Sequence, residues 1–309
     1  MRVLVTGGAG FIGSHISRVL VEEGHDVTVL DNLSRGRREL VPESAAFVHA
    51  DLADEAATEQ ALRGQDAVIH TAGYLEVAVS VERPVDFAEN NVVNSVRLLE
   101  AMRRAGVGTI VFSSSATVYG VPERLPLRES DQLGMQANPY GATKVAVETF
   151  LGVYHQLYDF NCAVMRYFNP YGPNELCDPE THAIPNVVRA ALERRAVPLY
   201  WQGQQVRDYI YVEDLARAHV APLQVKGFEV YNVGSDAGTK VIDIIETVSR
   251  IVGYDVAIDD LGDRPGDVEA LYASSEKLRT QLGWRPQVDL EEGLRRTIAH
   301  YRERLGIKG

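Results

Sequence analysis

The segment from Val3 to Gly13, VLVTGGAGFIG, constrains the fold more than any other part of the chain. Its first residues are apolar without alternation, which is typical of a strand buried on both faces of a parallel sheet. Gly8, Gly10 and Gly13 satisfy the pattern G-x-G-x-x-G, and Gly7 starts a second set spaced by three. A pyrophosphate needs such glycines because it lies against bare backbone N–H groups where a helix begins. The segment predicts a strand, a turn and a helix that bind a dinucleotide, with a plain β–α connection as the alternative.

An acidic residue after the next apolar run supports the dinucleotide hypothesis. The run 27–30 is followed by Asp31, which lies 18 positions beyond Gly13 (31 − 13). A carboxylate about 20 residues after the glycine turn is expected to bind the adenosine ribose, and it would repel a 2′-phosphate. The cofactor is therefore predicted to be NAD rather than NADP, although Arg35, Arg37 and Arg38 keep the second alternative open.

The same alternation of apolar runs and helical stretches continues through the first half of the chain. Strands are predicted at 3–5, 27–30, 46–48, 67–69, 109–112 and 163–165, and helices at 11–23, 55–62, 90–104 and 140–158. Strands and helices in this order favour parallel pairing through right-handed crossovers. The predicted fold class is α/β, with a doubly wound Rossmann-type parallel sheet.

The rhythm changes after about residue 170, where prolines interrupt the chain and the strands become short. Later helices are predicted at 212–222, 240–252 and 290–305. With about 150 residues per domain as a guide, 309 residues allow two unequal units. We predict a Rossmann domain over 1–170, to which the chain returns at about 212–235. A smaller C-terminal α/β lobe, formed by 171–211 and 236–309, would bind the substrate.

Composition excludes several classes of function. There are 31 basic and 43 acidic side chains, so the formal net charge is −12, which argues against a nucleic acid or an anionic membrane as partner. Two cysteines are too few for a disulfide framework, and the eight histidines lack the spacing of metal ligands, so no metal is expected. No apolar run reaches the ~18–20 residues of a membrane span. We expect a cytoplasmic protein that acts on a small molecule.

A tyrosine and a lysine provide candidate acid–base chemistry. Tyr140 and Lys144 are four residues apart, so they are neighbours on one face of the predicted helix. A nearby cation favours the phenolate and moves its pKa from ~10 towards a useful range. Ser115 follows the fifth predicted strand, at the sheet edge where open α/β folds bind ligands, and could bond a substrate hydroxyl. The alternative is an ordinary surface pair on an amphipathic helix.

The order of motifs along the chain resembles the extended short-chain dehydrogenase/reductase family, and within it the nucleotide-sugar epimerases and dehydratases. The matching segments are TGGAGFIGSH (6–15), LDNL (30–33), HTAG (70–73), FSSSATVYG (112–120), NPYGATK (138–144), RYFNPYGP (166–173), RDYIYVEDLA (207–216) and RPGD (264–267). They cover nearly the whole chain. The resemblance implies an NAD-dependent isomerase of galactose metabolism that inverts C4 of UDP-glucose or UDP-galactose through a 4-keto intermediate.

The resemblance also implies roles for individual residues. It makes Ser115, Tyr140 and Lys144 catalytic. It places NAD against Gly7, Gly10, Phe11, Ile12, Gly13, Asp31, Asn32, Asp51, Leu52, Ala72, Gly73, Asn90 or Asn91, Tyr140, Lys144 and Tyr167. It places the UDP-sugar against Ser115, Asn169, Tyr200, Arg207, Arg264 and Asp267. Three alternatives come from the residues themselves: Asp51 could cap a helix, Arg207 could pair with Asp208, and Arg264 could be a plain loop residue.

The residues after the serine bear on which reaction follows. Related 4,6-dehydratases carry an Asp-Glu pair there, whereas this chain has Ala116 and Thr117. Without a second acid to eliminate water, the resemblance favours return of the hydride and hence epimerisation. Other UDP-sugars, such as UDP-N-acetylglucosamine, UDP-N-acetylgalactosamine or UDP-glucuronate, remain alternatives. So does a non-catalytic dinucleotide sensor, although sensors usually lose the tyrosine or the lysine.

The resemblance finally implies a homodimer that pairs the helices 90–104 and 140–158 of two chains into a four-helix bundle. Apolar positions that could face the partner are Val92, Val96, Leu99, Val147, Leu151 and Tyr154. The alternative is that these side chains pack against the chain's own sheet.

Overall fold

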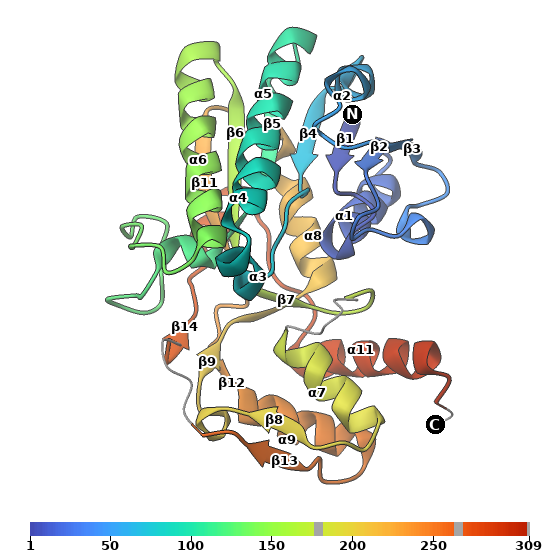
Figure 1. Ribbon diagram of the computed structural model, residues 1–309, viewed down its shortest axis with the longest axis vertical. Helices are drawn as coiled ribbons and strands as arrows, with labels where there is room; N and C mark the ends of the chain where they lie inside the picture. The colour runs from blue at the N-terminus through green and yellow to red at the C-terminus, as the bar shows by residue number, and fades with distance from the viewer. Residues whose placement is uncertain (176–181, 263–267, 308–309) are drawn as a thin grey trace.

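A seven-stranded parallel sheet forms the centre of the larger part of the molecule (Figure 1). The computed structural model describes residues 1–175, 182–262 and 268–307, so the predicted substrate residues Arg264 and Asp267 lie outside the described residues. The strand order is β11-β6-β5-β4-β1-β2-β3. The strands are β1 (Arg2–Thr6), β2 (Asp26–Asp31), β3 (Ala46–His49), β4 (Ala67–His70), β5 (Thr109–Ser115), β6 (Asn161–Tyr167) and β11 (Phe228–Val233).

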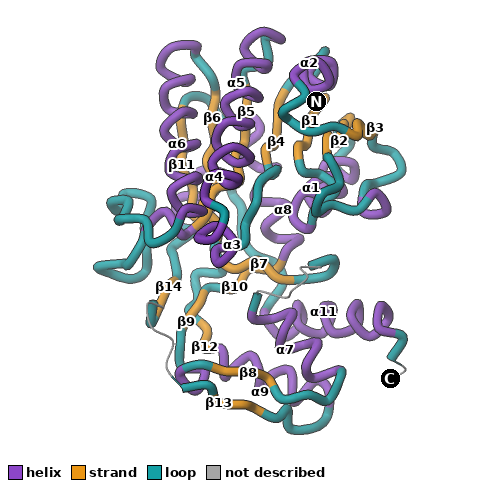
Figure 2. Tube along the Cα trace, viewed as in Figure 1, coloured by secondary structure: helices purple, strands orange, loops and turns teal. Residues whose placement is uncertain are grey.

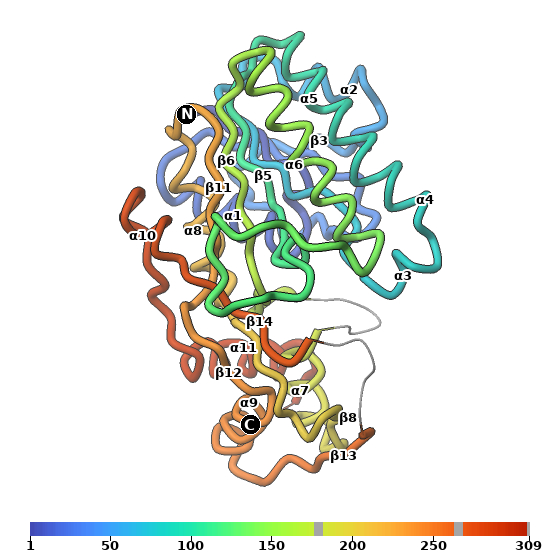
Figure 3. The backbone as a smooth tube through the Cα atoms, turned by 90° about the vertical axis from the view of Figure 1, so that its left-hand side faces the viewer, coloured from blue at the N-terminus to red at the C-terminus, as the bar shows by residue number. Residues whose placement is uncertain are grey.

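Helices cover both faces of this sheet, which explains why its strands are apolar without alternation (Figure 3). One face carries α1 (Phe11–Glu22), α8 (Val212–Val220) and α10 (Glu276–Leu282). The other face carries α2 (Glu55–Leu62), α5 (Asn94–Ala105) and α6 (Pro139–Tyr158). The short helices α3 (Val77–Glu82) and α4 (Pro84–Phe87) and a π-helix (Ala88–Val93) lead into α5. The predicted doubly wound α/β fold is confirmed.

The second region has its own apolar core between helices and short strands (Figure 2). Its helices are α7 (Ala183–Leu192), α9 (Val241–Val252) and α11 (Leu290–Leu305). Its parallel pairs are β7 (Asn169–Tyr171) with β10 (Tyr209–Tyr211) and β8 (Val197–Leu199) with β13 (Ile258–Asp260). A third small sheet places β9 (Val206–Arg207) between β12 (Thr239–Lys240) and β14 (Ala270–Leu271).

Across both regions, short 3₁₀ helices occur at Arg38–Leu40, Ala116–Tyr119, Trp201–Gly203 and Ala221–Gln224.

The apolar positions expected to face a partner chain need a correction. Leu99, Val147, Leu151 and Tyr154 are buried in the core between α5, α6 and the sheet, so for these four residues the alternative of packing on the chain's own sheet is correct. Val92 and Val96 are only partly exposed. The spacing of apolar residues does not distinguish the two faces of α6, because a stripe that covers a sheet has the same period as one that covers another helix.

Two buried histidines fasten helices to the sheet. On β4, His70 bonds through Nδ1 to the Thr6 hydroxyl at 2.7 Å and through Nε2 to the Ser95 hydroxyl of α5 at 2.8 Å. On α8, His219 bonds through Nδ1 to the Leu215 carbonyl at 2.9 Å and through Nε2 to the Ser113 hydroxyl at 2.8 Å. Burial lowers the pKa of His70 to about 3 and that of His219 to about 4, so both rings are neutral in the fold.

These two rings predict a loss of stability in mild acid. Below about pH 6.5 the unfolded chain binds a proton at each ring, whereas the folded chain does not until about pH 4 for His219 and pH 3 for His70. The stability that they contribute is therefore fully present above pH 6.5 and is lost as the pH falls towards their folded pKa values. Between pH 7.5 and 5.5 the two rings together should lower the free energy of unfolding by roughly 3 kcal/mol.

Urea unfolding at a series of pH values, with the NAD concentration fixed, measures this slope. The variant His219→Gln keeps a polar side chain but has no titrating ring, and should lose about one proton from the slope between pH 6.5 and 5.5. An identical slope in the parent and the variant would contradict the assignment of His219.

Candidate active site

The turn between β1 and α1 is built from backbone contacts that only glycine allows. Gly7 has a left-handed φ of +73°, and a Cβ added to it would lie 2.6 Å from the backbone nitrogen of Ala72. A Cβ on Gly13 would lie 2.2 Å from the Gly7 carbonyl oxygen. Gly10 is the N-cap of α1, with no side-chain cap and no acidic residue in the first turn. The turn therefore presents the positive end of the helix without a side chain over it, which fits an anion such as a pyrophosphate.

Asp31 packs against the glycine turn. Its carboxylate is buried and accepts from the backbone N–H groups of Ala9, at 3.0 Å, and Leu33, at 2.8 Å. These bonds hold the end of β2 against the glycine turn, and each carboxylate oxygen keeps a further lone pair for a ribose hydroxyl.

The three nearby arginines each have a partner elsewhere. Arg35 pairs with Glu76 at 2.8 Å, Arg37 lies 4.0 Å from Glu39, and Arg38 stacks over the Phe47 ring at 4.7 Å. These contacts favour NAD over NADP, because a guanidinium group that already pairs with a carboxylate or stacks on a ring is less available to bind a 2′-phosphate.

The structure brings the predicted ribose and adenine residues together. Asn32 donates from Nδ2 to Oδ2 of Asp51 at 2.6 Å, and Leu52 is buried beside them. Asp51 is not the cap of α2, because Asp54 holds that position and accepts from the Ala57 N–H at 3.1 Å. The helix-capping alternative for Asp51 is therefore wrong.

Residues that follow β4 lie between the glycine turn and Lys144. A Cβ on Gly73 would lie 3.3 Å from Oδ1 of Asn91 and 3.8 Å from Nζ of Lys144. Asn91 is buried and bonds both the N–H and the carbonyl of Tyr74, at 2.7 and 2.9 Å. Asn90 is half-buried and donates to Asn91 at 2.9 Å. Of the two asparagines predicted near the cofactor, Asn91 holds the loop in place and Asn90 remains the more accessible.

Tyr140 and Lys144 are buried together at the start of α6, so the surface-pair alternative is wrong. Asn138 caps this helix by accepting from the Gly141 N–H at 2.9 Å. The Lys144 ammonium donates to the Ser113 carbonyl at 2.8 Å and lies 5.7 Å from the Tyr140 ring centroid. The Ser115 side chain lies beside the Tyr140 phenol and acts to lower its pKa. Serine, tyrosine and lysine thus meet at the carboxyl edge of the sheet, as predicted from their order.

Burial sets the proton affinities of this cluster. It raises the pKa of Tyr140 to about 12, against the lowering influence of the Ser115 hydrogen bond. It lowers the pKa of Lys144 to about 8, against the raising influence of Glu148. Burial also raises the pKa of Tyr167 well above its ordinary value. A Lys144 amine with a lowered pKa can exchange its proton near neutral pH, whereas the Tyr140 phenol needs further stabilisation of its anion before it can act as a base.

A buried ion pair lies close to Lys144, and the motifs of the sequence did not indicate it. Glu148 bonds Arg166 of β6 at 2.6 Å and also accepts from the Ser114 hydroxyl. Arg166 donates in addition to the Tyr119 hydroxyl at 3.1 Å. Glu148 is four residues after Lys144, so the spacing that joined Tyr140 to Lys144 could have pointed to it.

Apart from Ser115 on β5, the predicted substrate residues that the structure describes come from the second region. Asn169, at the start of β7, donates from both N and Nδ2 to the Asp208 carbonyl, each at 3.0 Å. Arg207 ends β9 and donates to the Val206 carbonyl at 2.9 Å. Tyr200 precedes the 3₁₀ helix 201–203. Asn169 also lines a cavity of about 160 Å³ between β7 and the start of α7. A larger hollow of about 620 Å³ lies against β11 and α10 and holds none of the predicted residues.

Within residues 1–175, 182–262 and 268–307, no group of three or more histidine, cysteine, aspartate or glutamate side chains is arranged to hold a metal ion. Over the same part of the chain, no helix is both long and apolar enough to cross a membrane.

A doubly wound sheet, a glycine turn with an acid after β2, and a buried Ser-Tyr-Lys cluster together define a dinucleotide-binding protein of the short-chain dehydrogenase/reductase type. Residues 3–234 match the model of the NAD dependent epimerase/dehydratase family. The chain belongs to this family, whose cofactor is NAD, and the open glycine turn and Asp31 fit that cofactor.

Named relatives extend the match to almost the whole chain. A UDP-glucose 4-epimerase of Yersinia enterocolitica is 38% identical over an alignment that covers 92% of each chain. The crystal structure of a UDP-glucose 4-epimerase from Thermus thermophilus in complex with NAD is 40% identical, with a TM-score of 0.90 over 98% of this chain and 99% of that one. A UDP-N-acetylglucosamine 4-epimerase from Methanobrevibacter ruminantium, solved with UDP-N-acetylmuramic acid, is 33% identical, with a TM-score of 0.93 over 98% of each chain.

The glycine turn yields a direct test of the cofactor site. In Gly13→Ala the added Cβ would lie 2.2 Å from the Gly7 carbonyl, so α1 must move away from the turn. NAD affinity, measured by calorimetry, should fall at least about tenfold. Gly152→Ala is the matched control, because the nearest atom to its new Cβ is 3.9 Å away and the residue is inside α6. It should keep the parent's affinity and gain about 0.5–1 kcal/mol in stability. Unchanged affinity in Gly13→Ala would refute this account of the turn.

Proposed function

We propose that this protein is a UDP-glucose 4-epimerase, which interconverts UDP-glucose and UDP-galactose by inverting C4 and thereby serves galactose metabolism. The observation that carries the proposal is the meeting of Ser115, Tyr140 and Lys144 in a dry site beside the glycine turn. The named relatives add weight, because the Yersinia and Thermus proteins carry this activity in their names.

The chain's own residues account for the acid–base part of the reaction. Tyr140, as phenolate, takes the proton of the sugar 4-hydroxyl, while Ser115 bonds that oxygen and orients it. Lys144 supplies the nearby positive charge that favours the phenolate. When bound, NAD supplies the acceptor for the hydride of C4 and the donor that returns it. Return to the opposite face of the 4-keto sugar inverts the carbon, and Tyr140 gives the proton back.

The residues after Ser115 favour this outcome over elimination. Ala116 is buried and has no acid group. Thr117 follows it in a short 3₁₀ helix. Ser115 caps this helix, and its hydroxyl accepts from the Thr117 N–H at 3.3 Å. A dehydratase needs a second acid to remove water from the sugar, and neither side chain can act as one.

The nucleotide end of the substrate is proposed to bind in the second region. Arginine forks suit a diphosphate, so Arg207 and Arg264 are the proposed partners of its charges, with Asn169 beside them. Asp267 and Tyr200 are proposed for the uridine ribose and base. We propose the division expected above, with a Rossmann domain at 1–170 and about 212–235 and the substrate-binding lobe in the rest. The Methanobrevibacter relative keeps N-acetylated UDP-sugars as the second candidate substrate class.

We also propose a homodimer, through a face of α6 different from the one first expected. Phe150, Val153 and Leu157 are 38%, 40% and 66% exposed, and their i, i+3, i+7 spacing places them on one stripe. Because α5 and α6 lie side by side, a second copy of this face would complete a four-helix bundle (Figure 1). The cytoplasmic location stays a prediction.

The proposed activity predicts the products of a direct assay. Incubated with UDP-galactose and NAD, the protein should form UDP-glucose with no net release of reduced cofactor. Parallel incubations with UDP-N-acetylgalactosamine and UDP-galacturonate rank the substrate classes. Tyr140→Phe should lower kcat at least about a thousandfold and leave NAD affinity within about twofold of the parent's.

Tyr154→Phe is the control for that variant, because it removes another buried phenol from the same helix, one that donates to Glu100 at 2.7 Å. It should keep nearly full activity. A 6-deoxy-4-keto product would contradict the proposal, and unchanged activity in Tyr140→Phe would remove its mechanism.

The proposed dimer predicts an effect of charge on the α6 stripe. Light scattering after gel filtration should give about twice the mass of one chain for the parent. The double variant Val153→Glu/Leu157→Glu should give about the mass of one chain, because four carboxylates would meet across the interface. Ile258→Glu changes a residue of similar exposure on β13, 42% against 40% for Val153, and should stay dimeric. A dimeric double variant would place the interface elsewhere.

A further inference from the structure

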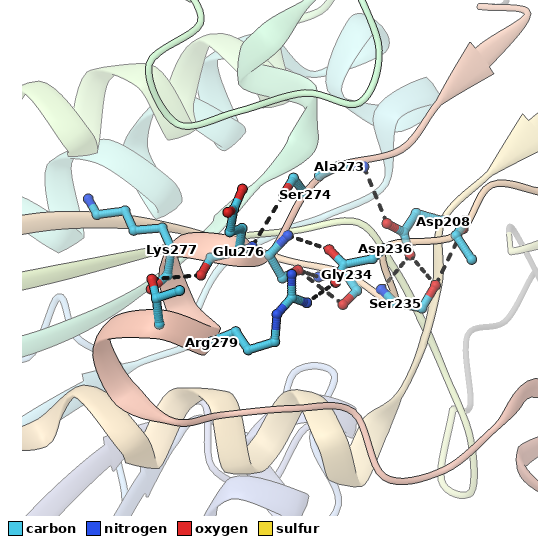
Figure 4. Close-up of polar contacts among 12 residues, drawn as sticks. Asp208, Gly234, Ser235, Asp236, Ala273, Ser274, Glu276, Lys277 and Arg279 are labelled. Carbon is cyan, nitrogen blue, oxygen red and sulfur yellow. Dashed lines mark hydrogen bonds and ion pairs between the residues drawn. The ribbon is translucent and has the colours of Figure 1, made fainter.

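Asp208 is a fully buried carboxylate that the proposed chemistry does not use (Figure 4). One of its oxygens accepts from the Ser235 N–H and the Ser235 hydroxyl, each at 2.7 Å, and the other accepts from the Ala273 N–H at 3.3 Å. These three donors are neutral, and burial accordingly raises the pKa of Asp208 to about 6. Holding a carboxylate in this way costs stability, so its position calls for an explanation beyond packing.

The residue joins segments that are far apart in the sequence. It lies between β9 and β10, while Ser235 follows the end of β11 in the large sheet and Ala273 follows β14. Gly234 allows the approach, since a Cβ there would lie 2.2 Å from an Asp208 carboxylate oxygen. The side chain therefore ties the crossover from β9 to β10 to the edge of the sheet that holds the catalytic cluster.

The backbone of Asp208 is equally occupied. Its carbonyl accepts both bonds of Asn169, from N and Nδ2 at 3.0 Å, and its N–H donates to the Leu271 carbonyl at 3.2 Å. Arg207 is its direct chain neighbour. Both proposed diphosphate contacts among the described residues are thus attached to Asp208, one by hydrogen bonds and the other by a peptide bond.

We infer that Asp208 is a positioning residue for the diphosphate of the substrate: by anchoring the β9–β10 crossover to Ser235 and Ala273, it fixes Asn169 and Arg207 relative to the catalytic cluster. The inference rests on the proposed function, because it takes the ligand to be a nucleoside diphosphate. Asp208 does not touch the reacting atoms, and its loss should weaken ground-state binding while the chemical step survives.

Asp208→Asn tests this with little change of shape. The asparagine amide must turn its NH2 group towards Ser235 or towards Ala273. In either orientation the NH2 group faces a backbone N–H, so two donors meet and that hydrogen bond is lost. The dissociation constant of UDP, measured by calorimetry on the NAD-loaded protein, should rise about tenfold. KM for UDP-galactose should rise by a similar factor while kcat and NAD affinity stay within about twofold.

Ser235→Ala removes one of the three donors and should weaken UDP binding by about threefold. In the double variant with Asp208→Asn the two effects should combine to less than their product, because both changes act on the same bond. If Asp208→Asn does not fold, Ser235→Ala alone still tests the positioning role of Asp208. Full UDP affinity in Ser235→Ala would then overturn the inference.

Asp214→Asn is the matched control. Asp214 is also fully buried, and it accepts from the N–H groups of Gln287, at 2.8 Å, and Val288, at 3.0 Å, so it anchors a segment that holds neither Asn169 nor Arg207. It should lose thermal stability and keep the parent's UDP affinity. Asp208→Asn with parental UDP affinity, or with a loss of kcat at constant KM, would overturn the inference. If the parent protein binds no UDP, that result would instead contradict the proposed function.

Discussion

The close approach of α1 to the ends of β1 and β4 is the contact on which the rest of the structure depends. Gly13 lies so near the Gly7 carbonyl, and Gly7 so near the backbone of Ala72, that a single methyl group at either position would separate the segments. That approach leaves the start of α1 open, brings Ala9 within reach of Asp31, and sets where the loop after β4 runs. The open start of α1 is therefore a consequence of backbone packing before any side chain contributes to it.

The cluster of Ser115, Tyr140 and Lys144 shows how burial and charge are balanced at the carboxyl edge of the sheet. Burial alone favours the neutral phenol of Tyr140 and the neutral amine of Lys144. A proton acceptor at Tyr140 needs the opposite pair, a phenolate next to an ammonium ion. Glu148 counteracts part of this effect on Lys144, and Arg166 in turn balances Glu148. Removing either Glu148 or Arg166 from such a buried pair typically costs about 3–5 kcal/mol of stability. The group that raises the pKa of Lys144 is therefore also one that holds α6 against β6.

Much of the nucleotide-binding half was predictable from sequence because its signals are local. Glycine spacing, the acid after β2 and the apolar strands each reflect a constraint within a few residues, and the predicted doubly wound sheet is the observed one. The exposed face of α6 was not predictable in this way, because Leu151 and Phe150 are adjacent apolar residues and only the position of the sheet decides which is covered. Glu148 with Arg166 was missed because the pair spans a helix and a strand 18 positions apart in the chain.

The second region depends on non-local contacts even more strongly, and this explains why the residues proposed to bind the substrate there would need an anchor. β9 and β12 have two residues each, and strands this short fix a side chain's direction poorly by ladder hydrogen bonds alone. A carboxylate whose two oxygens accept from two other segments supplies what the ladders lack, because Ser235 and Ala273 hold the β9–β10 connection from two sides of the sequence. In the proposed function, the stability lost by burying Asp208 is offset by a fixed backbone geometry where the short strand β9 presents Arg207 to the diphosphate.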